Sequence, residues 1–496
     1  MKTKTLGLNP YLPSWEFVPD GEPHVFDGRV YIFGSHDSRN GVSFCEGDYV
    51  VWSAPVDDLG NWRCEGISYR KDQDPLNGAD YDGVLPKIDM PFCTPENPHL
   101  LYAPDIAKGP DGRYYLYYSL DFTNVISVAV SDTPAGPYEF LDYVRNADGE
   151  IPDVGRWFDP AILSEESGNY LYYGFAPVFR FPGMEGVIFP GSMMVRLADD
   201  MHTIISDPVC VANGPDTAKG TAYEAHPFFE ASSIRKIGDW YYFVYSSLQG
   251  NELCYGMAKT PEGPFEYKGV IVSNGDLGYR GNELAVNYTG NNHGGLVEIG
   301  EETYIFWHRQ THGTGFSRQG CADKVHIAED GTIAQIEITS CGLNGGPLPA
   351  KNTYQSYIAC HLTEKDRTKV GHVVEPGPGE TVPTLPPEMP YITEEENPDY
   401  EKGLKPFIAN LQEGAVAEFK YLAFDGDEKN ITLELRGTGT VQALLDRPDG
   451  EQIAVVNCDS DTWIKVTGKL TKVEETHALY IKVTDGEVDF ASFTIA

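Results

Sequence analysis

The sequence predicts an all-β protein, a five-bladed β-propeller followed by a β-sandwich (jelly-roll) domain. Three observations lead to this prediction. An ionisable residue followed by a two-strand hairpin occurs five times; a pattern typical of a third strand and a turn follows the hairpins; and the region after about residue 400 alternates apolar and polar positions without a helical period. The ionisable residues that open the five hairpins are Asp20, Asp105, Asp159, Glu230 and His293.

Each hairpin joins two strand-like runs through a short turn that contains glycine. Glycine adopts the positive φ that a tight hairpin turn requires. The run after each turn is rich in aromatic residues, which favour strands. The five hairpins occupy residues 19–37, 103–119, 158–174, 229–246 and 292–308.

A second repeated pattern supplies the outer part of each blade. Residues 126–140 closely match residues 254–267, and residues 51–58 and 193–200 are weaker partners. Four strands that recur at an irregular spacing are typical of propeller blades with inserted loops. Because the inner strands of a propeller line its axis, we expect the five ionisable residues to converge at one funnel.

A Gly- and Pro-rich stretch at 345–349 marks the predicted boundary between the domains. The propeller is assigned to residues 1–350 and the sandwich to residues 351–496. The sandwich range includes a Pro- and Glu-rich segment, residues 375–398, that is predicted to be a linker or a long loop. Strand-like alternation follows at 417–424, 431–435, 439–446 and 478–483.

The composition excludes several classes of partner. A net charge of -37 repels phosphate groups, so neither nucleic acid nor an anionic membrane is expected. No run of eighteen apolar residues is present, and nine cysteines without C-x-x-C spacing indicate neither a disulfide framework nor a zinc site. The first ten residues lack the apolar core of a signal peptide, so the chain is expected to be cytoplasmic, or secreted if a signal peptide was trimmed from it. The oligomeric state is left open.

Three of the five ionisable residues are carboxylic acids suited to glycoside hydrolysis. That reaction needs one carboxyl group to protonate the leaving oxygen and a second to activate water or to attack. Glu230 follows the apolar residues 227–229 and is predicted to be the acid. Asp20 lies on a Pro/Gly turn and is predicted to be the base. Asp159 is predicted to raise the pKa of Glu230 and to orient it, because like charges disfavour ionisation.

Aromatic residues beside these acids are candidates for substrate binding. Trp157, Phe158 and Phe229 either form a platform for a sugar ring or pack between blades. Glu224, six positions before Glu230, is a rival acid, but no hairpin follows it in the same register.

For each of three further residues, the sequence is compatible with two roles. Asp105 either contacts substrate or bonds backbone amides in its own turn. Arg318 either holds substrate hydroxyls or the Asp159 carboxylate, or is a loop residue that pairs with the acidic surface. His293 is either an axial residue linked to a metal or water, or a buried spectator.

The chain resembles glycoside hydrolase family 43, a family of five-bladed propellers. The resemblance covers about residues 9–345 and rests on matches to Pro19-Asp20-Gly21, Ala103-Pro104-Asp105-Ile106, Asp159-Pro160, Glu230 with Tyr241-Tyr242, and His293-Gly294. Two departures are Tyr102 in place of the usual Trp and Glu230-Ala231-Ser232 in place of the commoner Glu-Gly-Pro.

The resemblance implies functions for these residues. It implies that Asp20 is the base, Asp159 the pKa modulator and Glu230 the acid of an inverting enzyme. It also implies that His293 is linked through water to a structural calcium ion on the axis, which the chemistry itself does not need. The C-terminal part resembles a family 6-type carbohydrate-binding module at residues 439–450, where Trp463 and Tyr480 either stack on sugars or belong to the core.

The sequence therefore predicts an inverting exo-glycosidase that removes terminal pentosyl residues from plant hemicellulose or pectin fragments. α-L-Arabinofuranosidase is the first expectation; β-xylosidase or another furanosidase is the alternative within the class. A non-catalytic sugar-binding propeller and a structural propeller are alternatives from other classes. Inversion predicts a separation of about 6.5–9.5 Å between the Asp20 and Glu230 carboxyl groups.

Overall fold

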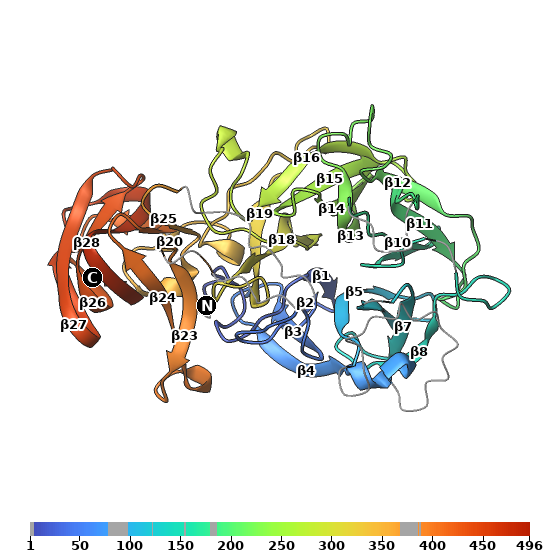
Figure 1. Ribbon diagram of the computed structural model, residues 1–496, viewed down its shortest axis with the longest axis horizontal. Helices are drawn as coiled ribbons and strands as arrows, with labels where there is room; N and C mark the ends of the chain where they lie inside the picture. Colours follow the sequence, from blue (N-terminus) through green and yellow to red (C-terminus); the bar gives the residue numbers. More distant parts are fainter. Residues whose placement is uncertain are drawn as a thin grey trace.

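The computed structural model describes residues 4–77, 98–121, 123–152, 155–178, 186–367, 385 and 388–496. It confirms the predicted fold class. Figure 1 shows a ring of five blades with β1, β5 and β13 near its centre, and a separate, strongly curved sheet that carries the C-terminus. None of the helices in these described ranges is long and apolar enough to cross a membrane.

Four blades are four-stranded antiparallel sheets whose strands pair in sequence order. The first blade contains β1 (Glu22–Phe26), β2 (Arg29–Phe33), β3 (Tyr49–Pro55) and β4 (Arg63–Tyr69), followed by the short 3-10 helices η1 (Lys71–Gln73) and η2 (Pro75–Asn77). The second contains β5 (Leu101–Lys108), β6 (Tyr114–Leu120), β7 (Ile126–Ser131) and β8 (Glu139–Tyr143).

The next two blades repeat this arrangement. The third contains β9 (Ala161–Glu165), β10 (Gly168–Tyr173), β11 (Gly191–Leu197) and β12 (Val209–Asn213). The fourth contains β13 (Phe228–Ile237), β14 (Trp240–Ser247), β15 (Glu252–Ala258) and β16 (Glu266–Ser273), and the 3-10 helix η3 (Tyr279–Gly281) follows it.

The fifth blade has three strands within the described residues: β17 (Leu296–Ile299), β18 (Glu302–Gln310) and β19 (Arg318–Val325). The prediction of a fourth strand here was wrong, because the N-terminal segment lies against β19 instead. The Tyr11 N–H donates to the Gly320 carbonyl, and the Ala322 N–H donates to Oδ1 of Asn9. A parallel bridge between Gly21 and Gly294 joins the fifth blade to the first. These contacts close the ring.

Tyrosines of the second strands fill the space between blades. Tyr117, Tyr172 and Tyr245 are fully buried, and each hydroxyl donates to a backbone carbonyl, at Met201, Pro261 and His226 respectively. A buried hydroxyl is tolerated only when it is hydrogen-bonded, so these bonds allow large aromatic rings at the blade interfaces.

The C-terminal domain is one nine-stranded sheet that folds over on itself. Its long strands are β26 (Asn430–Leu445), β27 (Gln452–Lys469) and β28 (Glu474–Ile495). Along one edge β28 pairs with β26, and along the other it pairs in turn with β25, β24 and β21. The remaining elements are β20 (Leu348–Pro349), β21 (Thr353–Gln355), β22 (His361–Thr363), β23 (Tyr391–Glu396), β24 (Leu404–Gln412) and β25 (Val416–Asp425), with the 3-10 helices η4 (Gly342–Asn344), η5 (Ser356–Ile358) and η6 (Glu401–Gly403).

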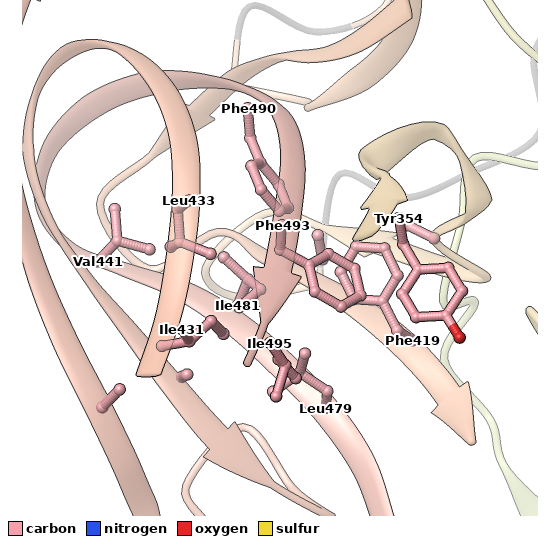
Figure 2. Close-up of a cluster of buried hydrophobic side chains, with 14 of the residues drawn as sticks. Tyr354, Phe419, Ile431, Leu433, Val441, Leu479, Ile481, Phe490, Phe493 and Ile495 are labelled. Atoms are coloured by element: carbon pink, nitrogen blue, oxygen red, sulfur yellow. The ribbon is translucent and has the colours of Figure 1, made fainter. Parts of the chain in front are cut away.

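Aromatic residues form the centre of this domain. Figure 2 shows Tyr354, Phe419 and Phe493 facing one another, with the ring centres of Phe419 and Phe493 4.8 Å apart. The apolar residues of β26 and β28 surround them. The core lies between the two halves of the folded sheet, as expected for a sandwich.

The boundary differs slightly from the prediction. Strand β20 already pairs with β25 of the sandwich, although residues 348–349 were assigned to the propeller. Of the segment 375–398, residues 375–384, 386 and 387 lie outside the described residues, and residues 391–396 form β23 rather than a loop. β23 pairs with β24.

The two domains are joined by hydrogen bonds rather than by a linker alone. Nη1 of Arg309, in β18, donates to the Ala359 carbonyl at 2.8 Å. Nε2 of His312 lies 2.5 Å from Oε2 of Glu394, in β23, and both side chains are buried. The sandwich therefore supports the loop between β18 and β19, which leads directly into Arg318.

Candidate active site

Asp20 lies two residues before β1 and is 5% exposed. Its φ of 56° is in the left-handed region, which is costly for a residue other than glycine and is often found at functional sites. Its backbone N–H donates to Nδ1 of His308, and Nε2 of His308 lies 2.8 Å from the Asn291 carbonyl. His308 therefore carries its proton on Nε2 and is neutral, because burial lowers its pKa to about 3.

Arg318 is the first residue of β19 and is only 2% exposed. Its Nη1 donates to Oδ1 of Asp20 at 3.0 Å, while Nε and Nη2 donate to Oδ2 and Oδ1 of Asp37 at 2.8 and 2.9 Å. The hydrogen bonds of Arg318 run to Asp20 and Asp37, and its predicted contact with substrate hydroxyls stays a prediction. Arg318 is not a loop residue.

This ion pair keeps Asp20 ionised. Burial by itself raises the pKa of Asp20, but the neighbouring groups, with the Arg318 charge the strongest among them, together outweigh that effect and leave the pKa below its ordinary value. A buried carboxylate with a bonded guanidinium remains charged at neutral pH. Asp20 is therefore equipped to accept a proton.

Asp159 lies just before β9, is 4% exposed and also has a positive φ, of 45°. Its Oδ2 accepts the backbone N–H of Ala231 at 3.0 Å. Burial, followed by the negative charge of Asp20, raises the pKa of Asp159 well above its ordinary value. Asp20 and Asp159 thus lie close enough to influence each other and have pKa shifts in opposite directions.

Glu230 lies within β13, between two irregularities in the pairing of β13 with β14. It is half-buried, and the next residue, Ala231, has a φ of 66°. Ala231, which follows Glu230 in the chain, donates its N–H to Asp159, so Glu230 is held near Asp159. The sequence suggested that Glu230 has the most apolar surroundings of the three acids, yet the structure gives it the greatest exposure. Glu224 is exposed in the loop before β13, where it accepts the Gly220 N–H.

A row of half-buried aromatic rings lies beside these acids. The ring centres of Tyr102 and Phe158 are 5.7 Å apart, those of Phe158 and Phe175 are 5.3 Å apart, and those of Phe175 and Phe229 are 5.2 Å apart. Two of the rings belong to residues next to Asp159 and Glu230. Such a wall is suited to a sugar ring, which presents apolar C–H groups.

Two residues predicted to bind substrate are part of the core instead. Trp157 is 2% exposed and stacks on Tyr173 with ring centres 3.8 Å apart, because its side chain points between blades. Asp105 is fully buried; Oδ1 is bonded to Nε2 of His24 at 2.6 Å, and Oδ2 accepts the Ile162 N–H. Asp105 also accepts the N–H of its neighbour Ile106, which confirms the backbone-bonding reading.

His293 lies between the acids and the propeller axis and is 6% exposed. Its Nδ1 is 3.8 Å from Oδ2 of Asp159, and its Nε2 is 3.8 Å from Oε1 of Glu22. Burial lowers the pKa of His293 to about 4, so the ring is neutral. The structure thus places His293 between Asp159 and Glu22, while its axial role and its link to calcium remain predictions.

Sequence reasoning missed four residues of the site: His308 and Asp37, which contact Asp20 or its partner, and Phe175 and Phe44 at its edge. The Phe44 ring lies over the guanidinium of Arg318 at 4.7 Å. Asp37 closes the first hairpin pattern and His308 closes the fifth, so their positions at the ends of inner hairpins were the available signal. Phe175 follows the third hairpin in the same way.

A cavity of about 240 Å³ lies between the domains. It is lined by Asp276 and Glu337 of the propeller and by His361, Glu418 and Tyr480 of the sandwich, among others. Nε2 of His361 is 2.8 Å from Oδ2 of Asp276, and Nδ1 of His361 contacts Oε2 of Glu418. Tyr480 therefore faces the propeller rather than an open sugar-binding surface.

Trp463, the other candidate in the sandwich, is also occupied. Nζ of Lys405 lies 3.9 Å from the ring centre and the Arg436 guanidinium 4.5 Å from it, while the indole N–H donates to Glu395. The Trp463 side chain is therefore bound by other residues of the sandwich. The structure provides no support for sugar stacking at Trp463.

Comparisons with known proteins agree with the family resemblance seen in the sequence. A family model described as "Glycosyl hydrolases family 43" matches residues 87–333. A protein named "Xylosidase/arabinosidase" from Thermoclostridium stercorarium is 45% identical over 499 residues, which cover 98% of each chain. A protein of the same name from Bacteroides ovatus is 30% identical over 358 residues, 66% of this chain and 97% of that protein.

Solved structures are also similar to this chain, one of them over 67% of its length. That structure is the GH43 β-xylosidase/α-arabinofuranosidase CoXyl43 from a compost microbial metagenome, in complex with xylotriose and described as a calcium-free form. It has a TM-score of 0.50 and 25% identity, and the match covers 67% of this chain and 98% of that one.

Proposed function

The chain belongs to glycosyl hydrolases family 43, and on this premise we propose that it is an exo-acting glycosidase that removes terminal pentosyl residues. The relatives that cover most of its length are named xylosidase/arabinosidase, which supports a pentose substrate. Terminal α-L-arabinofuranosyl groups are the first substrate and terminal β-xylosyl groups the second. Fragments of plant hemicellulose or pectin carry such groups.

Asp20 acts as the general base in this proposal. Its carboxylate takes a proton from a water molecule as that water attacks the anomeric carbon. Arg318 supports this role because its charge keeps Asp20 ionised and its two bonds to Asp37 fix its orientation. His308 fixes the backbone of Asp20.

Glu230 acts as the general acid and protonates the oxygen of the leaving group as the glycosidic bond breaks. Its partial exposure lets it reach a substrate in the funnel and exchange its proton with solvent afterwards. Asp159 bonds the Ala231 N–H and so holds the strand that carries Glu230. Two carboxyl groups that act as acid and base without forming a covalent intermediate invert the anomeric configuration. Carboxyl groups carry out every proton transfer, so the reaction itself requires no metal.

The observation that carries this proposal is the opposite behaviour of two adjacent buried acids. Arg318 lowers the pKa of Asp20, whereas burial and Asp20 raise that of Asp159. Such a divergence between neighbouring carboxyl groups is typical of hydrolase sites, and here it separates the ionised base, Asp20, from Asp159, the neighbour that holds the strand of the acid. A structural or purely sugar-binding propeller has no need for it.

The test is a panel of aryl glycosides assayed with product detection by NMR. We expect turnover of aryl α-L-arabinofuranoside and β-xyloside, no turnover of aryl β-glucoside, and a first-formed sugar with the inverted anomeric configuration. A product that first appears with retained configuration contradicts the assignment of Asp20 as a base. Absence of turnover on every pentoside contradicts the proposed function.

The sandwich is proposed to buttress the propeller. Its Glu394 holds His312 in the loop before Arg318, and Trp463 and Tyr480 are both engaged. Arabinoxylan pull-down with the full chain and with Trp463→Ala tests this role. We expect equal binding; weaker binding by the variant supports a sugar site in the sandwich instead.

A further inference from the structure

Four charged or polar side chains meet on the propeller axis and form what is called here the axial cluster: Glu22 and His24 from β1, Asp105 from β5 and Arg235 from β13. One donor atom from each of Glu22, His24 and Asp105 lies within 4.8 Å of the others, a spacing that a metal ion could bridge. The calcium ion expected from the family resemblance was linked through water to His293, whose Nε2 lies 3.8 Å from Oε1 of Glu22 beside this cluster.

The guanidinium of Arg235 already occupies the centre of this group. Its Nη2 lies 2.6 Å from Oε2 of Glu22, 3.1 Å from Nε2 of His24 and 3.9 Å from Oδ1 of Asp105. Nη2 also donates to the Pro23 carbonyl, and Nη1 donates to the Ile234 carbonyl at 2.7 Å. The cation is thus bonded to two backbone carbonyls as well as to Glu22.

The remaining donors do not suit calcium. Calcium takes six to eight oxygen ligands, whereas both carboxylate oxygens of Asp105 and one of Glu22 are already bonded within the protein. His24 offers nitrogen, and its Nε2 is held by Asp105 at 2.6 Å. Oε1 of Glu22 is the carboxylate oxygen of the axial cluster that lacks a hydrogen bond among the described residues.

The charge of Arg235 and the tight packing around Glu22 also disfavour a bound calcium ion. Glu22 is 1% exposed and Asp105 is fully buried, so an ionised carboxylate at either position needs a nearby cation. Arg235 supplies one positive charge, which would repel a second cation beside it. A Cβ on Gly295 would lie 2.6 Å from Oε2 of Glu22, which shows how closely the fifth blade packs against the cluster.

We propose that Arg235 is a built-in axial cation that takes the place of a metal ion, so that this protein needs no calcium to hold its hub together. Arg235 joins the first, second and fourth blades through Glu22, Asp105 and its own strand. Glu22 in turn faces His293, which faces Asp159, so the cluster also supports the floor of the site. Arg235 is a positioning residue and contacts no substrate.

The proposal predicts a gain of metal binding when the arginine is removed. Arg235→Ala leaves Glu22 and Asp105 without their cation and creates room beside them. We expect its Tm to fall by several degrees and to rise again with added calcium chloride, because a ligand that binds the folded state stabilises it. Arg235→Lys keeps the positive charge, so its Tm should stay close to that of the wild type and should not change with added calcium.

The experiment is thermal unfolding of the full chain, with EDTA and with increasing calcium chloride, alongside calorimetric titration with calcium alone. Lys236→Ala is the matched control, because the adjacent lysine points to the surface and pairs with Glu165. Wild type and Lys236→Ala should show no change in Tm with EDTA or calcium. These readouts do not depend on hydrolysis, so they separate this proposal from the proposed function.

Two results would overturn the proposal. One is stoichiometric calcium binding by the wild type that disappears in Glu22→Gln. The other is an Arg235→Ala variant whose Tm remains insensitive to calcium. If Arg235→Ala does not fold, the wild-type titration and the Arg235→Lys comparison still decide the question, since a metal-dependent hub would lose Tm in EDTA in both proteins.

Discussion

The Nη1 atom of Arg318 lies 3.0 Å from the Oδ1 atom of Asp20, and neither side chain is more than 7% exposed. The two residues are 298 positions apart and come from the last and the first blade. The bond therefore forms only when the ring closes. Formation of the proposed base is in this way tied to completion of the fold.

This pair predicts a change in the pH profile. Replacing Arg318 by Met removes the charge that lowers the pKa of Asp20, so the acid limb of the kcat/KM profile should move to higher pH. Arg318→Lys keeps the charge but loses the bidentate hydrogen bond to Asp37, so the acid limb of its kcat/KM profile should move less than that of the Met variant. The measurement is kcat/KM against pH on an aryl arabinofuranoside. An acid limb that stays in place in the Met variant would mean that Asp20 is not the group that titrates there.

The acid assignment predicts a large loss of turnover on Glu230→Gln. A missing general acid typically lowers the rate by about 10²–10⁴-fold, while ground-state binding is retained because the amide has the same shape. Glu224→Gln is the matched control and should leave kcat unchanged. Steady-state kinetics and binding of a non-hydrolysed pentoside measure both effects. The opposite ranking of the two variants would transfer the acid role to Glu224.

The aromatic row predicts a separation of binding from stability. Phe175→Ala removes the ring between Phe158 and Phe229 and should raise KM by about fivefold, as expected for a loss of ~1 kcal/mol, with a smaller change in kcat. Trp157→Phe alters a buried stack and should lower Tm without raising KM. Kinetics and thermal unfolding of both variants test this. A rise in KM for Trp157→Phe alone would restore Trp157 as a substrate contact.

The inter-domain contact at His361 predicts a pH-dependent stability. Burial acts to lower the pKa of His361, but Glu418 and the bond to Asp276 outweigh it, even against the charge of Lys420, and hold the pKa above its ordinary value of 6.5. A raised folded-state pKa stabilises fully below about pH 6.5, and this contribution disappears as the pH rises through the folded-state pKa.

His361→Gln should therefore cost about 3–5 kcal/mol of stability at pH 6 and less at pH 8, because one partner of a buried ionic contact is lost. His326→Gln, at an exposed position, is the control. Unfolding by denaturant at both pH values measures the difference. An equal loss at pH 6 and pH 8 would show that His361 acts only by packing.

The five hairpins could be predicted because their signals are local. A glycine turn such as Asp27-Gly28, with positive φ at both residues, and the aromatic strand after it are set by neighbouring residues. The positions of Asp20, Asp159 and Glu230 before or within the inner strands follow from the same register. The fourth strand of the last blade failed as a prediction, because the N-terminal segment that covers β19 is more than 300 residues away from it in sequence.

The burial and the contacts of individual side chains could not be predicted from the local sequence. Trp157 and Phe158 are adjacent and both aromatic, yet one is buried and the other lines the site, because alternate residues of an extended chain face opposite ways. Asp105 and Asp159 occupy equivalent places in their hairpins, but Asp105 is turned towards His24 and the backbone of the next blade. No local pattern distinguishes these cases.

The sequence by itself determined most of the strand pattern, the number of blades and the positions of Asp20, Asp159 and Glu230 at the inner strands, because these depend on residues close together in the chain. Only the tertiary structure decided how the buried charges pair: Arg318 with Asp20, and Arg235 with Glu22. Electrostatic interactions in a buried site depend on distances of a few ångströms, and those distances are set by blades that are far apart in sequence.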